Sequence, residues 1–320
     1  MTNAIKFNQV VKVGCGLDVH RSLITATIMK SDDNLETKEF TAYTSSLKSL
    51  RDWCKEEGVT HIAMESTGVY WKPVFNVLEE DFEILLVNAR HVKNVPGHKT
   101  DKKDSRWLSK LLLSGLLKGS FIPTCDIRNL RDLVRYRKKV VGQAASEKNR
   151  IIKILEDANI KLSSVLTNLD GAVGTKIINS LIDGVTDVEE LMKFYHKKIK
   201  TDKEEFRLAL EGKITEHHRF MLRIHKNSIA DKERLIKEID AQIDVATKEY
   251  QVEIEMLQSI PGVGKDSAIS IISEIGVDMS KFPNENHLSS WAGMSPGNNE
   301  TGGKKKSQGQ FMEINICRAH

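Results

Sequence analysis

The sequence predicts a mixed α/β domain followed by helical regions. In the first hundred residues, short apolar strands alternate with helical segments, a pattern typical of a sheet covered by helices. Two long stretches beyond residue 125 carry apolar residues at helical spacing, and a glycine turn near residue 262 separates two further helical segments. The length of 320 residues allows two or three domains, which we expect at residues 1–125, 126–252 and 253–320.

Five strands are expected in the first domain, from runs of apolar and β-branched residues between turn signals. A helix follows the third strand, with Ser46 as its expected cap and Gly58 as its stop. The expected order is three strands, helix, strand, helix, strand and helix. The strands cover residues 11–19, 23–29, 38–43, 59–65 and 82–88, and the second helix covers residues 70–78.

Acidic residues stand at the ends of two of these strands and at the start of the last helix. Asp18 closes the first strand and Glu65 the fourth. Thr100 can cap a helix whose first turn holds Asp101 and Asp104. Because crossover connections bring strand ends to one edge of a sheet, these acids can become neighbours. Taken singly, each acid also fits a plainer role as a turn residue, a surface ion-pair partner or a helix-dipole partner.

Taken together, the four carboxylates predict a divalent metal site. Like charges at close range raise one another's pKa values, and a bound cation removes that conflict. Magnesium prefers carboxylate and phosphate oxygens, and two such ions can hold both the attacking and the leaving oxygen of a phosphodiester. We therefore expect Mg²⁺ as the cofactor, with Asp18, Glu65, Asp101 and Asp104 as its ligands.

Three segments carry a resemblance to a known family: Gly16-Leu17-Asp18-Val19, residues 63–71 and residues 99–106. In this order and spacing they resemble the DEDD motifs of the insertion sequence 110 (IS110) family of transposases, which is related to the Piv DNA invertase. The resemblance implies an RNase H-like domain similar to the RuvC Holliday-junction nuclease, with the four acids as catalytic metal ligands. It also implies DNA recombination during transposition, with the element ends and the target DNA as substrates and a structured RNA as guide.

The charge distribution indicates a polyanionic partner. Residues 99–153 hold 15 Lys or Arg and five acids, a charge of +10, so the rest of the chain carries −6 of the total of +4. Such a field attracts nucleic acid through phosphate contacts. A helix over 129–156 can present its basic face to phosphate, pack its apolar face on another helix, or do both. The candidate nucleic-acid-binding residues of this region are Lys99, Lys102, Lys103, Arg106, Arg135, Arg137, Lys138 and Lys139.

A second long helix is expected from 214 to 255. It can pair antiparallel with the first long helix as a hairpin, or with another subunit. This region resembles the coiled-coil insert of the family in place and composition, and the resemblance implies a homodimer or homotetramer.

A glycine turn follows that helix. Gly262, Gly264 and Lys265 stand where backbone N–H groups at a helix start can bind a DNA phosphate, as in a helix-hairpin-helix element, or where two helices are simply connected.

The last residues resemble the family's C-terminal transposase domain with two departures. Thr301 stands where the family has a serine nucleophile, so it is the candidate catalytic hydroxyl, although its methyl group restricts χ1. Residues 308–320 differ from the family's basic, glycine-containing continuation, and a shifted reading frame permits a segment that resembles it. One hypothesis is therefore a frameshifted, truncated and inactive copy with an incomplete C-terminal domain.

Cysteine spacing and hydropathy bear on the compartment. Four scattered cysteines without a CxxC pair argue against zinc and against a disulfide framework. No membrane span or signal peptide is expected, so we predict a cytoplasmic protein.

Two rival functions stay open: a structure-specific junction endonuclease that uses metal-activated water, and a catalytically dead nucleic-acid-binding protein.

Overall fold

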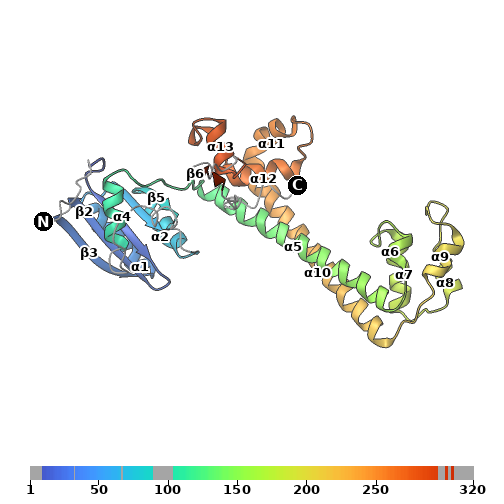
Figure 1. The fold of residues 1–320 in the computed structure, drawn as a ribbon. Helices are drawn as coiled ribbons and strands as arrows, with labels where there is room; N and C mark the ends of the chain where they lie inside the picture. The colour runs from blue at the N-terminus through green and yellow to red at the C-terminus, as the bar shows by residue number, and fades with distance from the viewer. Residues whose placement is uncertain are drawn as a thin grey trace. The chain divides into compact units, whose positions relative to one another are not determined.

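Five strands in the first part of the chain form one mixed sheet, as expected (Figure 1). Their spatial order is β3-β2-β1-β4-β5. The first three strands pair antiparallel, whereas β1, β4 and β5 run parallel to one another. The strands are β1 (Gly14–Val19), β2 (Leu23–Ser31), β3 (Asn34–Thr41), β4 (His61–Glu65) and β5 (Glu83–Val87).

This computed structural model describes residues 9–31, 33–65, 68–88, 104–294, 300–301 and 304–305. The chain divides into two compact units, residues 1–122 and 123–320, and each is described by itself. None of the described helices is both long and apolar enough to span a bilayer.

Helices cover both faces of the sheet in the first unit. Helices α1 (Thr44–Glu56) and α2 (Trp71–Leu78) bury apolar side chains against one face, where Leu17 and Met64 lie in the core. Helix α4 (Asp104–Leu113) packs on the opposite face through Leu108 and Leu112, against Ala63 and Val87. The sheet is thus the middle layer of three.

The start of α1 corrects one prediction. Ser46 is not its cap, because the helix begins at Thr44 and its preceding residue makes no side-chain capping hydrogen bond. The Ser46 hydroxyl instead accepts a hydrogen bond from the backbone N–H of Thr41, at 3.0 Å, and so ties the helix to the end of β3. Gly58, with a φ of 72°, follows the helix end as expected.

Two long helices form an antiparallel hairpin in the second unit, so the structure shows the intramolecular alternative for their pairing. Helices α5 (Cys125–Asp157) and α10 (Glu216–Ala246) lie side by side (Figure 1). Contacts between Arg137 and Asp240 and between Glu147 and His225 show the antiparallel direction, because the residue number rises on one helix as it falls on the other.

The predicted continuation of the second helix to residue 255 is wrong. Helix α10 ends at Ala246, and the short η2 (Lys248–Tyr250) leads into α11 (Gln251–Gln258). The Thr247 hydroxyl donates to the Ile243 carbonyl oxygen at 2.8 Å, and the Thr247 N–H bonds to the same oxygen at 2.9 Å, so both groups bond to the last turn of α10. The buried Tyr250 then donates its hydroxyl to Asp126, which anchors the turned chain on α5.

Two further cores complete the second unit. The segment between the long helices folds over the far end of the hairpin, and Phe206 and Leu222 are buried in its core. It contains α6 (Leu162–Val165), α7 (Ala172–Ile182), α8 (Val188–Met192) and α9 (Lys203–Ala209). At the near end, Ile269 of α12 packs with Leu130 and Ile243 of the long helices. The last elements are α12 (Lys265–Ile275), η3 (Met279–Lys281), α13 (Glu285–Trp291), β6 (Glu300–Thr301) and β7 (Lys304–Lys305).

Candidate functional site

Asp18 and Glu65 lie at the same ends of two neighbouring parallel strands. The last register pair between β1 and β4 is Leu17 with Met64, and each acid is the next residue along its strand. The Asp18 side chain is 22% exposed, and Glu65 is half-buried. Strand pairing therefore brings together two acids that are 47 positions apart in the sequence.

The alternation of side chains places both acids on the face that α4 covers. Leu17 and Met64 belong to the core beneath α1 and α2. Ala63 belongs to the opposite core with Leu108 and Leu112 of α4. Because successive residues of a strand point to opposite faces, Asp18 and Glu65 share the face of Ala63.

Helix α4 runs antiparallel to β1, so its first residue lies toward the same end of the sheet. A Cβ on Gly14 would come within 2.8 Å of a Leu113 methyl carbon at the helix end. One on Gly16 would come within 2.2 Å of the Ser105 carbonyl oxygen at the helix start. Asp104 precedes Ser105, and Asp18 is two residues beyond Gly16 along the strand. The start of the helix thus faces the end of the strand that carries Asp18.

The described residues supply part of the predicted metal site. Asp101 lies outside them, and among the residues that the structure describes no three acids, histidines or cysteines gather closely enough to hold a metal ion. Asp18 has one near neighbour that the sequence did not single out: His20 Nε2 lies 3.2 Å from Asp18 Oδ2. His20 is largely exposed, with 66% of its side chain accessible.

A buried set of hydroxyl groups joins α4 to the sheet beside these acids. Ser109 accepts a hydrogen bond from the Gly16 N–H at 2.8 Å and donates to the Thr27 carbonyl oxygen at 2.6 Å. Ser105 and Thr27 share a hydroxyl–hydroxyl hydrogen bond of 2.8 Å. Sequence reasoning missed this set. Its signal was two serines four positions apart on the apolar side of a helix, opposite a strand that contains Gly-Cys-Gly.

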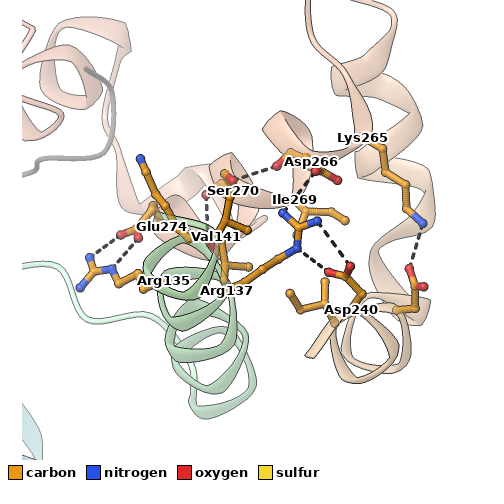
Figure 2. A pocket seen from close by; sticks show the side chains of 14 residues that line it. Arg135, Arg137, Val141, Asp240, Lys265, Asp266, Ile269, Ser270 and Glu274 are labelled. Atoms are coloured by element: carbon orange, nitrogen blue, oxygen red, sulfur yellow. Dashed lines mark hydrogen bonds and ion pairs between the residues drawn. The ribbon is translucent and has the colours of Figure 1, made fainter. Parts of the chain in front are cut away.

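Four of the predicted nucleic-acid-binding residues line one groove in the second unit. Arg135, Arg137 and Lys138 come from α5, and Lys265 comes from the start of α12 (Figure 2). The groove has a volume of about 380 Å³ and an apolar floor that includes Val141 and Ile269. The fold therefore gathers basic residues from positions about 130 apart in the sequence.

Acidic residues of the same groove pair with three of these cations. Arg135 binds the buried Glu274 carboxylate through two hydrogen bonds of 2.9 Å. Arg137 binds Asp240, and it lies 3.5 Å from Asp266 (Figure 2). Both arginines therefore act as intramolecular links between α5 and the neighbouring helices.

Lys265 is held in the same way at the rim of the groove. Its ammonium group donates to Asp244 at 2.9 Å, and this hydrogen bond raises the pKa of Lys265. The bond links the first residue of α12 to α10.

Other predicted contacts to nucleic acid have different surroundings. Arg106, Lys138 and Lys139 are exposed, whereas Lys99, Lys102 and Lys103 lie outside the described residues. The predicted glycine turn is present between α11 and α12, where Gly262 has a φ of 89° and Gly264 precedes the first helical residue. Space around both glycines is open, because a Cβ added at either one would have no described atom of another segment within 4 Å.

The candidate nucleophile lies on a short hairpin. Thr301 belongs to β6 and pairs with Lys304 of β7. Its side chain and the segment 308–320 lie outside what the structure describes, so the catalytic role and the truncation hypothesis stay predictions.

Comparison with known proteins adds evidence of kinship. A family model for the DEDD transposase of IS110 elements, described as "Transposase", matches residues 15–160. A second, described as "Transposase IS116/IS110/IS902 family", matches residues 254–314. A transposase for insertion sequence element IS1111A, from Coxiella burnetii (strain RSA 493 / Nine Mile phase I), is 20% identical over 280 residues. That match covers 86% of this chain and 65% of the length of the relative.

Proposed function

Because this chain belongs to the IS110 family of transposases, we propose that it acts in DNA transposition as a Mg²⁺-dependent recombinase that cleaves and exchanges DNA strands. The observation that carries the proposal is the approach of Asp18, Glu65 and the start of α4 to one end of the sheet. Acids at such a position are suited to metal-assisted phosphodiester chemistry.

The fold supports an RNase H-like, RuvC-like assignment for residues 1–125. Three antiparallel strands followed by two parallel ones, with the acids at the end of the central strands, agree with that architecture. In the same proposal, residues 126–252 form the coiled-coil insert, and residues 253–320 form the C-terminal transposase domain with a helix-hairpin-helix-like turn.

The donor set fits magnesium by its chemistry. Asp18, Glu65, Asp101 and Asp104 would hold the ion through carboxylate oxygens, which are the hard ligands that Mg²⁺ prefers. When bound, Mg²⁺ would withdraw charge from the scissile phosphate. The chain's own contribution is to carry two acids on neighbouring strands and a third at a helix start, so that secondary structure sets their spacing.

Thr301 is the proposed nucleophile. Its hydroxyl oxygen would bond to a DNA phosphorus while the bond from that phosphorus to a deoxyribose oxygen breaks, and the released oxygen would take up a proton. The covalent link conserves the energy of the phosphodiester for rejoining. The position of Thr301 in the segment that matches the second family model supports this assignment.

The proposed partners are element-end DNA, target DNA and a structured guide RNA, in a homodimer or homotetramer in the cytoplasm. Exposed Lys138 and Lys139 on α5 support contact with a polyanion. The turn at Gly262 and Gly264 is a further candidate for phosphate contact.

The test is formation of a covalent protein–DNA link. The protein is incubated with Mg²⁺, cognate RNA and element-end DNA, and DNA-linked protein is measured on a denaturing gel. We expect a link for the unmodified chain and none for Asp18→Asn or Thr301→Ala. Asp33→Asn is the matched control, because this exposed acid lies in the turn between β2 and β3, at the opposite end of the sheet.

Two other outcomes would replace the proposal. Cleavage that needs Mg²⁺ and survives Thr301→Ala, without a covalent link, would identify a junction endonuclease. Salt-sensitive binding that is unchanged by Asp18→Asn, with no cleavage under any condition, would identify a nucleic-acid-binding protein without catalysis.

A further inference from the structure

We propose that Ser109 is a positioning residue of the metal site, whose hydroxyl fixes the start of α4, and with it Asp104, against the end of β1 that carries Asp18. The inference rests on the proposed function, because it assumes that these acids hold Mg²⁺. It concerns side chains that hold the helix in place and do not themselves contact the ion.

The Ser109 hydroxyl connects the helix to two strands at once. It accepts the N–H of Gly16 on β1 at 2.8 Å and donates to the carbonyl oxygen of Thr27 on β2 at 2.6 Å. Gly16 and Thr27 are register partners, so a single helical side chain spans the pair. Ser109 is 0% exposed, so removal of its hydroxyl would take a hydrogen-bond partner from a buried backbone N–H and a buried carbonyl oxygen.

A second link sits one helical turn earlier. Ser105, 2% exposed, shares a 2.8 Å hydrogen bond with the hydroxyl of Thr27, which in turn lies 2.9 Å from the hydroxyl of Thr37 on β3. Ser105 and Ser109 are four residues apart, so both face the sheet from one side of α4. The helix is thereby attached at two successive turns by directional bonds in addition to its leucine contacts.

Because Gly16 has no side chain, the backbone of α4 can lie in direct contact with the backbone of β1 at this position. A Cβ there would lie 2.2 Å from the Ser105 carbonyl oxygen and 2.6 Å from the Ser109 nitrogen, so the helix backbone rests directly on the strand. Asp104 is the residue before Ser105, and Asp18 is the second residue after Gly16. A shift of the helix start would therefore move one acid relative to the other, and metal affinity is sensitive to such displacements.

The experiment compares Ser109→Ala with Ser114→Ala. Among the described residues, the Ser114 hydroxyl bonds only to the Lys110 carbonyl oxygen of the preceding turn, at 2.9 Å, so its loss leaves the attachment to the sheet intact. Mg²⁺ binding to the full chain is measured by isothermal titration calorimetry, and exchange of the Gly16 amide hydrogen is measured without metal. We expect Ser109→Ala to weaken Mg²⁺ binding by about ten-fold and to speed Gly16 exchange. Ser114→Ala is expected to change neither.

Asp18→Asn separates this inference from the function on which it rests. If Asp18→Asn abolishes Mg²⁺ binding while Ser109→Ala leaves it unchanged, Ser109 has no positioning role and the metal proposal stands. If Asp18→Asn also leaves Mg²⁺ binding unchanged, the metal site itself is wrong.

A second variant covers the case in which Ser109→Ala does not fold. Ser109→Cys keeps a small side chain at this position and replaces the hydroxyl with a thiol, a weak donor and acceptor, so the bonds to Gly16 and Thr27 are weakened. We expect it to weaken Mg²⁺ binding several-fold with the circular-dichroism spectrum unchanged. Unchanged Mg²⁺ affinity in folded Ser109→Cys would overturn the proposal.

Discussion

Arg135 of α5 holds the carboxylate of Glu274 on α12 through two parallel hydrogen bonds, and the Glu274 side chain is only 7% exposed. Arg131 adds a third contact, with its Nε 3.2 Å from the same carboxylate. A bidentate hydrogen bond between an arginine and a carboxylate is a strong interaction. A buried carboxylate that loses such a partner destabilises the folded protein.

We therefore expect Arg135→Ala to lower the free energy of unfolding by about 2 kcal/mol, because Glu274 loses two of its three described contacts. The Lys138→Ala/Lys139→Ala variant serves as the comparison, since both lysines are exposed on the same helix. It should leave stability unchanged and reduce the salt dependence of DNA binding by about two counterions. Urea unfolding and binding at several salt concentrations measure both effects. A variant Arg135→Ala that keeps its stability and loses DNA affinity would make Arg135 a phosphate ligand instead.

Asp244 limits the availability of Lys265 to a polyanion, because it holds the lysine ammonium at 2.9 Å. We predict that Asp244→Asn tightens DNA binding about two- to five-fold at low salt, with the gain lost at high salt. Asp231→Asn is the matched control, since this exposed acid of α10 pairs with Arg234 of the same helix. Equal effects of the two substitutions would show that only net charge matters.

Helix α4 packs so closely on β1 that a side chain larger than glycine at position 16 would collide with the Ser105 carbonyl oxygen. Gly142 in α5, in contrast, has open space around it. We expect Gly16→Ala to destabilise the protein by about 3 kcal/mol through overpacking against Ser105. Gly142→Ala, the same substitution inside an exposed helical position, should stabilise it by about 0.5–1 kcal/mol. Thermal unfolding of both variants checks the prediction, and a neutral Gly16→Ala would contradict the close contact.

Glu147 gives the helical hairpin an acid-sensitive contact. Its side chain is 11% exposed and lies 2.6 Å from His225 Nδ1. Burial acts to raise the pKa of Glu147, but the His225 hydrogen bond and the charges of Arg150 and Lys232 outweigh it and lower the pKa below its ordinary value. A lowered pKa contributes stability that is present above the ordinary carboxyl pKa, about 4.3, and is lost as the pH falls through the folded-state value.

Accordingly, Glu147→Gln should cost about 2 kcal/mol at pH 7, and this difference should shrink as the pH falls below about 4. Glu238→Gln, an exposed position on α10, should cost less than about 0.5 kcal/mol at either pH. The free energy of unfolding is measured by urea titration at pH 7 and at a pH below about 4. A difference between the unmodified chain and Glu147→Gln that does not depend on pH would rule out the ion pair as its cause.

The sheet and the long helices could be predicted from the sequence because their signals are local. Alternating apolar residues marked the strands, and helical spacing marked α5. The end of α10 could not be predicted, because the turned chain is held by the hydrogen bond of Tyr250 to Asp126, a residue 124 positions away in the sequence. Propensity alone did not reveal that tertiary contact.

The candidate site was predictable to a similar degree. Strand order was sufficient to bring Asp18 and Glu65 to one end of the sheet. The partners of the basic residues were not predictable, because Glu274 is 139 positions from Arg135 and Asp240 is 103 positions from Arg137. Charge counting treated these arginines as free for phosphate, whereas packing of α5 on α10 and α12 supplies their counterions.

We propose that Asp18 of β1 and Glu65 of β4 contribute to one divalent-ion site. Crystals soaked with Mn²⁺ test this shared site, because anomalous scattering locates the ion independently of any assay. We expect an anomalous peak within about 2.0–2.6 Å of carboxylate oxygens of both Asp18 and Glu65, and its loss in Asp18→Asn. Saturating Mn²⁺ with no peak between these two acids would contradict it.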